Sequence, residues 1–363
     1  MATIQEIADR LGISKGTVSK ALNGASDISE TLQKTVIETA VEMGYHKLRR
    51  PGGLRKLCVL IANMEYTEPH HFGHELILGF RQMAEPAGYT VEIVPATDAL
   101  QASVSYDAFM LQHDYLGAFI LGFSLSDPWM KHFPTSRTPA VLYDNYISSN
   151  PCMASVGIDN REGMELAVSH LKRLGHTRIG YLSHALDSHI MQVRREAFFQ
   201  SMRRQGLFAD ESLTGSSHYI AHCMEKYLPR LLYEQQVTAI ICSHDQIANA
   251  AMIQCQQMDF RIPEDVSIVG FDDLPICAYT SPPLTTIRQN RLLLGKSGYY
   301  ALESLLNGIP IWDLAAARRA GSAKLYESGF LRVGTPQTAK GDVHILQKVY
   351  VPLRYRIRIF CPG

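Results

Sequence analysis

Short hydroxyl side chains and ammonium groups gather between Ser14 and Lys20, in the stretch SKGTVSK. Hydroxyl groups of this length can bond phosphate oxygens or base edges, and lysine ammonium groups neutralise phosphates. Lys15, Gly16 and Lys20 fall on one exposed side of the short helix expected here. The pattern therefore suggests contact with DNA, although a three-helix bundle without any DNA role fits the composition equally well.

Catalytic and metal-binding patterns fail elsewhere in the chain. Gly295-Lys296-Ser297 resembles the end of a phosphate-binding loop, but position 290, where the first glycine belongs, is asparagine. Asp272 and Asp273 are adjacent on an expected strand, so their side chains should point to opposite faces. The histidines at 70, 71 and 74, and those at 218 and 222, have no convincing third ligand. We expect no enzyme activity, no cofactor and no metal.

Three short helices are expected to position the hydroxyl-rich stretch. Thr3 and Glu6 fit a capping box that starts the first helix, and Gly12 ends it. Ser14 caps a second helix that runs from Lys15 to about Leu22. Ser29 caps a third, which closes at Gly44. A helix, a tight glycine turn and a short helix with a polar face are typical of a helix-turn-helix.

The net charge of zero conceals an uneven distribution. Residues 1–56 hold nine basic and six acidic residues, a net charge of +3 that the remainder balances. The chain has 363 residues, of which 46% are hydrophobic and 19% are charged, which excludes a disordered protein. Long apolar runs and an N-terminal leader pattern are both missing, and the seven cysteines are scattered singly. These features favour a cytoplasmic protein of two or three domains with no membrane contact.

The N-terminal string TIQEIADRLGISKGTVSKALNG resembles the DNA-binding headpiece of the lactose-repressor (LacI/GalR) family of bacterial regulators. The resemblance implies that the second helix enters the major groove of an operator. The residues expected to contact DNA or to hold the headpiece on it are Thr3, Ser14, Lys15, Gly16, Thr17, Ser19, Lys20 and Asn23.

From residue 57 onward, short apolar strands alternate with helical stretches, which predicts two doubly wound parallel sheets. VGIDNREG, HLKRLGHTRIGYL, IPEDVSIVGFDD and PPLTTIRQ resemble the regulatory core of the same family. That core has a periplasmic-binding-protein-like fold. The resemblance implies a headpiece at 1–46, a basic hinge at 47–56, a core at 57–312 and an atypical tail at 313–363. Within the core, the N-lobe would take about 57–157 and 288–312, and the C-lobe about 158–287.

The same resemblance implies an effector site between the lobes, where strands end. The residues carried over are Asp144, Arg194, Asp245 and Asp272, with Phe72 and Tyr219 as partners for a sugar ring. Asp245 heads an expected helix at 246–258, so capping and ligand contact are both open for it. His244 stands where many relatives have asparagine, which suggests an effector different from the common hexoses.

Two segments depart from the family pattern. The hinge is several residues shorter than usual, and Pro51-Gly52-Gly53 opposes a helix, so either Leu48 or Leu54 could be the minor-groove wedge. At the C-terminus, residues 349–359 alternate as a strand does, but whether that strand docks is open.

The sequence therefore predicts a transcriptional repressor. We expect it to bind operator DNA as a homodimer under the control of a sugar-like effector. The alternative is a sugar-binding module without DNA activity, of the periplasmic type.

Overall fold

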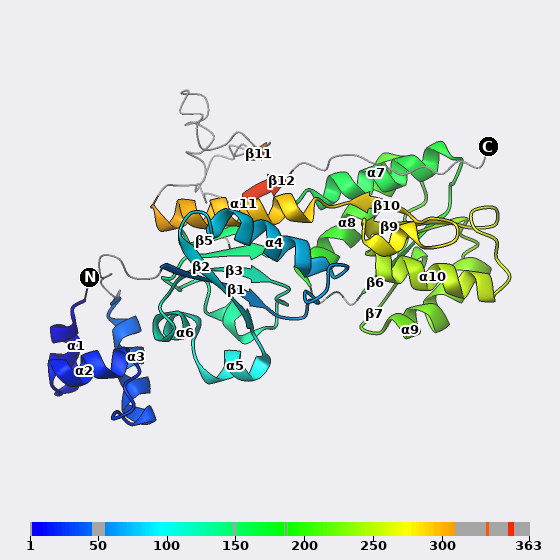
Figure 1. Cartoon of the computed structure of the whole chain (residues 1–363). Helices are drawn as coiled ribbons and strands as arrows, with labels where there is room; N and C mark the ends of the chain where they lie inside the picture. Colours follow the sequence, from blue (N-terminus) through cyan, green and yellow to red (C-terminus); the bar gives the residue numbers. More distant parts are fainter. Residues whose placement is uncertain are drawn as a thin grey trace, which may run out of the picture.

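We describe a computed structural model of the chain, shown in Figure 1, for residues 2–45, 55–147, 150–184, 186 and 188–308. The backbone is also described at 332–333 and 348–351. Both hinge leucines, Leu48 and Leu54, lie outside these ranges.

The first three helices form a small bundle: α1 (Ile4–Leu11), α2 (Lys15–Leu22) and α3 (Glu30–Glu42). Each starts where the sequence predicts, because Thr3, Ser14 and Ser29 accept hydrogen bonds from the first helical turns. Gly12 adopts the left-handed conformation, with φ of 66°, and so ends α1. The bundle has its own core of fully buried apolar side chains, which include Ile7, Val18, Ala21, Val36 and Ala40.

The N-lobe is built on a sheet in the order β11-β12-β5-β4-β3-β1-β2. Its parallel strands include β1 (Arg55–Ile61), β2 (Tyr89–Pro95), β3 (Tyr115–Leu121), β4 (Ala140–Tyr143) and β5 (Met153–Ile158). Against this sheet lie α4 (Phe72–Ala84) and α11 (Arg291–Leu306), with α5 (Asp98–Ser103) and α6 (Tyr106–Gln112) elsewhere on the lobe (Figure 1).

The glycine of the apparent phosphate-loop motif has a packing role. A Cβ on Gly295 of α11 would lie 2.0 Å from the carbonyl oxygen of Leu76, and one on Gly79 of α4 would lie 2.1 Å from that of Leu292. The two helices therefore touch backbone to backbone, which only glycine permits.

The C-lobe has a second parallel sheet in the order β10-β9-β8-β6-β7. Its strands are β6 (Ile179–His184), β7 (Thr214–Ser217), β8 (Ala239–Cys242), β9 (Ser267–Asp272) and β10 (Thr285–Arg288). The helices around it are α7 (Asn160–Arg173), α8 (His189–Arg204), α9 (Ile220–His222) and α10 (Asp245–Gln257). The expectation of two doubly wound lobes is confirmed.

The chain passes between the lobes from β5 into α7 and again from β10 into α11 (Figure 1). Ligands of parallel sheets bind beyond the carboxyl ends of the strands. Polar side chains that follow β4, β6, β8 and β9 are therefore the candidates for ligand contact.

A short strand from the tail completes the N-lobe sheet. Strand β12 (Lys348–Val351) pairs in parallel with β5, Lys348 opposite Ser155 and Val351 opposite Ile158, and β11 (Arg332–Val333) pairs with it in antiparallel fashion. The sequence left the docking of this strand open. In the structure it covers the edge of β5, and the rest of 313–363 lies outside the described residues.

Deleting residues 309–363 should expose the hydrogen-bonding edge of β5 and lower the melting temperature by several degrees, at about 2–4 °C per kcal/mol lost. Deleting only 352–363, which keeps β12, should leave the melting temperature close to that of the full chain. Differential scanning calorimetry on both deletions tests this. Equal melting temperatures for the two deletions would mean that β12 contributes nothing to the stability of the N-lobe.

Candidate DNA-binding and effector sites

The polar face of α2 is open to solvent. Lys15, Gly16 and Lys20 are exposed, and Thr17 and Ser19 are half-buried. The Ser14 hydroxyl accepts a hydrogen bond from the Thr17 amide at 3.1 Å, and Asn23 donates to the Ser19 carbonyl at 2.7 Å. The ends of the short helix are thus fixed by its own side chains, which holds the polar face in one orientation.

The two lysines of this face have different partners. The Lys20 ammonium forms an ion pair with Asp27, and this interaction holds the pKa of the Asp27 carboxyl below its ordinary value. Lys15 has no ion pair among the described residues. Within the part of the chain that the structure describes, Lys15 is therefore an unpaired cation, whereas the charge of Lys20 is partly balanced by Asp27. Thr3, by contrast, caps α1: its backbone amide donates to the Glu6 carboxylate at 2.7 Å.

Arg194 of α8 lies at the centre of the interlobe network. Its side chain is only 3% exposed, and it donates to the Asn160 amide oxygen at 2.7 Å and to the Ser243 carbonyl at 2.5 Å. Its guanidinium carbon lies 3.8 Å from the centre of the Phe271 ring. The sequence placed Arg194 at the start of its helix. The helix in fact begins five residues earlier, at His189, so Arg194 projects from its second turn.

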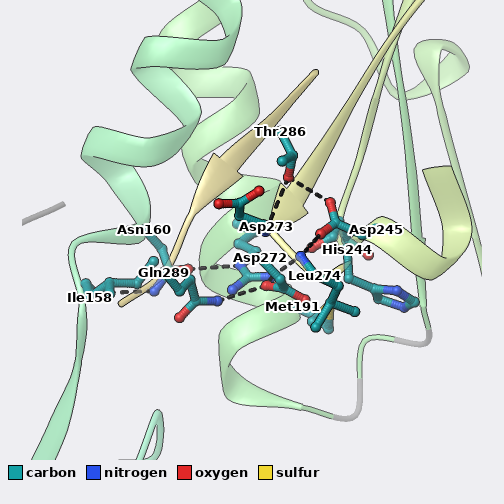
Figure 2. A network of polar contacts seen from close by, with 12 residues as sticks. Ile158, Asn160, Met191, His244, Asp245, Asp272, Asp273, Leu274, Thr286 and Gln289 are labelled. Atoms are coloured by element: carbon teal, nitrogen blue, oxygen red, sulfur yellow. Dashed lines mark hydrogen bonds and ion pairs between the residues drawn. The ribbon is translucent and has the colours of Figure 1, made fainter. Parts of the chain in front are cut away.

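Asp272 ends β9 and faces Arg194, with a carboxylate oxygen 3.7 Å from the guanidinium nitrogen. The same oxygen accepts a hydrogen bond from the Gln289 amide at 2.7 Å, and the Gln289 carbonyl accepts one from the Tyr143 hydroxyl at 2.8 Å. Figure 2 shows Gln289 reaching toward Asp272 from beside Asn160. Because Tyr143 belongs to β4, this chain of bonds joins the N-lobe to the C-lobe.

Backbone geometry at the end of β9 also departs from expectation. Asp272 and Asp273 both have positive φ, 121° and 55°. They are therefore not consecutive residues of a regular strand, and the expectation that they point to opposite faces does not apply. Such strain in non-glycine residues is common at ligand sites.

Asp144 follows β4 of the N-lobe and also has positive φ, 56°. Burial raises the pKa of its carboxyl to about 6, although the nearby Arg194 lowers it. Burial likewise raises the pKa of Asp272, against the opposing effect of Arg194. Two carboxyl groups and one guanidinium thus share a poorly solvated space.

Asp245 does not cap α10. It is completely buried, and its two oxygens accept hydrogen bonds from the Leu274 amide at 2.7 Å and the Thr286 hydroxyl at 2.6 Å (Figure 2). The cap of α10 is instead His244, whose Nδ1 accepts from the Ile247 amide at 3.4 Å. The capping prediction for Asp245 is wrong, and its oxygens are already occupied by groups that hold β9 and β10 in place.

Three histidines line the carboxyl ends of neighbouring strands. The ring of His184, at the end of β6, lies 6.2 Å from that of His244 and 6.3 Å from that of His218, measured between ring centres. Burial, together with Arg194 and His184, lowers the pKa of His244 to about 3. His244 is therefore a neutral ring. The described residues include no set of three side chains placed to hold a metal ion.

The two aromatic candidates differ sharply in exposure. Phe72 begins α4, with its ring 5.9 Å from that of Tyr143 and the Arg291 guanidinium 5.5 Å away. Tyr219 precedes α9 and is 75% exposed. Phe72 thus adjoins the network of Tyr143 and Gln289, whereas the Tyr219 side chain is exposed to solvent next to His218.

Comparison with known proteins agrees with this arrangement. Residues 3–47 match the model of the bacterial regulatory proteins of the lacI family, and residues 168–340 match that of a periplasmic binding protein-like domain. The chain is 28% identical over 312 residues to the HTH-type transcriptional repressor PurR of Aliivibrio salmonicida, covering 85% of this chain and 92% of that one. It is 27% identical over 314 residues to the repressor CytR of Escherichia coli K12, covering 85% and 90%.

The chain has the N-terminal domain of the lacI family of bacterial regulatory proteins, followed by a periplasmic binding protein-like domain.

Solved structures show the same fold. The transcriptional regulator CelR in complex with cellobiose has a TM-score of 0.62 at 22% identity, covering 85% of this chain and 94% of that one. The Lac repressor bound to ONPG has a TM-score of 0.58 at 23% identity, covering 85% and 93%. No described helix is both long and apolar enough to cross a membrane.

Sequence reasoning missed three members of the interlobe network. Asn160, Gln289 and Tyr143 were not singled out, although Gln289 stands in the quoted PPLTTIRQ motif and Asn160 in VGIDNREG. His184 was also missed. Its position at the end of an apolar strand could have identified it, because Asp144 and Asp272 were proposed for that reason.

A pH-dependent stability difference should follow from Asp144. Its raised pKa means that the native state resists ionisation, so wild-type stability falls as pH rises from about 4, its unfolded value, through about 6. Asp144→Asn has no proton to lose there. Its melting temperature relative to wild type should therefore increase between about pH 4 and pH 6 and level off above about pH 7.

Thermal denaturation at a series of pH values provides the measurement. The control is Asp259→Asn, which makes the same substitution at an exposed position. An offset for Asp144→Asn that does not vary with pH would show that burial leaves the ionisation of Asp144 unchanged in the native protein.

Proposed function

We propose that this protein is a cytoplasmic transcriptional repressor that binds operator DNA as a homodimer and releases or strengthens that binding when a small, sugar-like effector enters the interlobe cleft. We keep the domain boundaries proposed from the sequence, which are a headpiece at 1–46, a hinge at 47–56, a core at 57–312 and a tail at 313–363. The observation that carries this proposal is the combination of an open, capped recognition helix with a buried guanidinium–carboxylate site where two lobes meet.

Operator binding is supported by the headpiece. The exposed Lys15, Gly16 and Lys20 lie at the surface of α2, as base and phosphate contacts require. One relative of known structure, the Lac repressor dimer, is bound to operator. Since a palindromic operator has two half-sites about one helical turn apart, a homodimer is the form that would read it.

The effector class is supported by the site chemistry. Carboxylates and guanidinium groups pair with neighbouring hydroxyls, and aromatic rings cover apolar sugar faces. Asp144, Arg194, Asp272 and Phe72 supply these groups, with His244 as a neutral hydrogen-bonding ring. CelR, a structural relative, binds cellobiose.

A sugar-binding module without DNA activity remains the second candidate, because the two-lobed core by itself would serve it. The headpiece favours the regulator, because α1 and α2 are capped and hold an exposed polar face in one orientation. A sugar-binding module without DNA activity would not need that face.

Lys15 and Lys20 should affect DNA binding in different ways. Lys15→Ala should reduce the preference for operator over random duplex by about 1–3 kcal/mol, because a free cation at the start of α2 is placed for a guanine. Lys20→Ala should weaken operator and random duplex alike and reduce the slope of log affinity against log salt by about 0.9.

Fluorescence anisotropy with duplexes selected by the full-length protein from a randomised pool gives both quantities. Substitution of the exposed Lys34 on α3 by alanine is the control for loss of charge alone. Failure of the wild-type protein to enrich any duplex would support the module without DNA activity.

Asp272→Asn should abolish the effector response and leave operator affinity unchanged, because the amide cannot supply the charge that faces Arg194. A thermal-shift screen of the full-length protein against neutral sugars, sugar phosphates and nucleosides identifies the compound to use. Its effect on operator binding is then compared in wild type, Asp272→Asn and the control Asp259→Asn. An undiminished response in Asp272→Asn would move the effector site away from the end of β9.

A further inference from the structure

Helix α6 is apolar on two sides. Tyr106, Phe109 and Met110 pack into the N-lobe with Trp129 and Phe133. Ala108 and Leu111 belong instead to the apolar cluster of the headpiece, together with Val104 just before the helix. A helix on a domain surface normally has a single apolar face, so the second one needs a cover.

The cover in this structure is the chain's own headpiece. Helix α3 lies against α6 (Figure 1), and Ala108 is 2% exposed beneath it. On α3, Ile37 and Ala40 are buried and Val41 is half-buried in the same cluster. The backbone at Gly44 also approaches the lobe, since a Cβ there would collide with the Arg137 guanidinium.

The contact is open on one side. A groove of about 640 Å³ runs between the two bodies, with Glu38 and Glu42 of α3 on one wall and Ser105, Gln112 and His132 on the other. The apolar contact is therefore narrow and bordered by solvated polar groups. Such an interface can hold two bodies in a fixed orientation and still be separated by one added charge.

Docking leaves the recognition face free, because Lys15, Gly16 and Lys20 remain exposed while α3 is covered. The linker alone would not fix the headpiece. Residues 46–54 can span up to about 30 Å when extended and include Pro-Gly-Gly, which opposes a helix.

We propose that the outer face of α6, formed by Ala108 and Leu111 and extended by Val104 just before the helix, is a docking site for the headpiece of the same chain. Docking through α3 carries the recognition helix as a rigid extension of the N-lobe. The distance between the two half-sites that a dimer reads is then set by the lobes and not by the linker.

Ala108→Glu tests the docking without altering the headpiece. Hydrogen exchange in the full-length protein should become faster in peptides from α3 and from 98–112, because a buried carboxylate would separate the two helices. Ala99→Glu places the same side chain at an exposed position of α5 and should leave exchange at the wild-type rate. Should Ala108→Glu disturb the fold of the lobe, Leu111→Lys on the same face gives the second measurement.

Operator binding gives a readout that rests on the proposed function. Wild type should lose affinity steeply when about two base pairs are inserted between half-sites. Ala108→Glu should bind the best spacing roughly tenfold more weakly and tolerate the insertion better, because a freed headpiece has a lower effective concentration at its half-site.

Unchanged exchange in both Ala108→Glu and Leu111→Lys would overturn the docking, whatever the DNA result. Protection of 98–112 that disappears on dilution to monomer would also overturn it, since the cover would then be the partner's headpiece. Altered exchange without any change in spacing preference would retain the contact and refute its role in setting the spacing.

Discussion

Burial of the Arg194 guanidinium is the constraint on which the arrangement of the interlobe network depends. Arginine does not give up its proton, so a side chain only 3% exposed must find its compensation inside the protein. Its charge is compensated by groups from α7, from the end of β8 and from β9. These groups are Asn160, the Ser243 carbonyl, the Phe271 ring and Asp272. The ends of these elements are thus drawn to one point.

The same constraint makes the site responsive to a ligand. Asp272 lies 3.7 Å from Arg194, which is close enough for attraction but longer than a direct hydrogen bond. Asp144 and Asp272 pay for their burial with raised pKa values. The hydroxyl groups of a polyol of the kind proposed above would give these charges hydrogen-bonding partners. A ligand that contacts both lobes in this way would shift the balance between lobe arrangements only by the difference in its affinity for them.

Local features of the fold were predictable from the sequence, and long-range ones were not. The capping residues Thr3, Ser14 and Ser29 were read correctly because a cap is recognised within four residues. Strands β7 and β10 were missed because TGSS and TTIR lack a continuous apolar run. For Asp245 the sequence left capping and ligand contact open, and it gave no sign of the partners Leu274 and Thr286, which are 29 and 41 residues away. The choice between cap, ligand contact and structural bond depends on tertiary neighbours that spacing does not reveal.

Two sets of contacts link the interlobe network to the headpiece. Tyr143 joins β4 to the network through Gln289, so hydrogen bonds connect the C-lobe to the sheet of the N-lobe. That sheet carries α6 on its surface through the ring contacts of Tyr106 and Phe109 with Trp129, which tie the helix to the apolar core of the lobe. A headpiece held on the outer face of α6 would follow any rotation of the N-lobe as one body. Among the described residues, the packed contact between α3 and α6 is the one that would couple the orientation of the headpiece to that of the lobe. The two-sided apolar character of α6 supplies this contact.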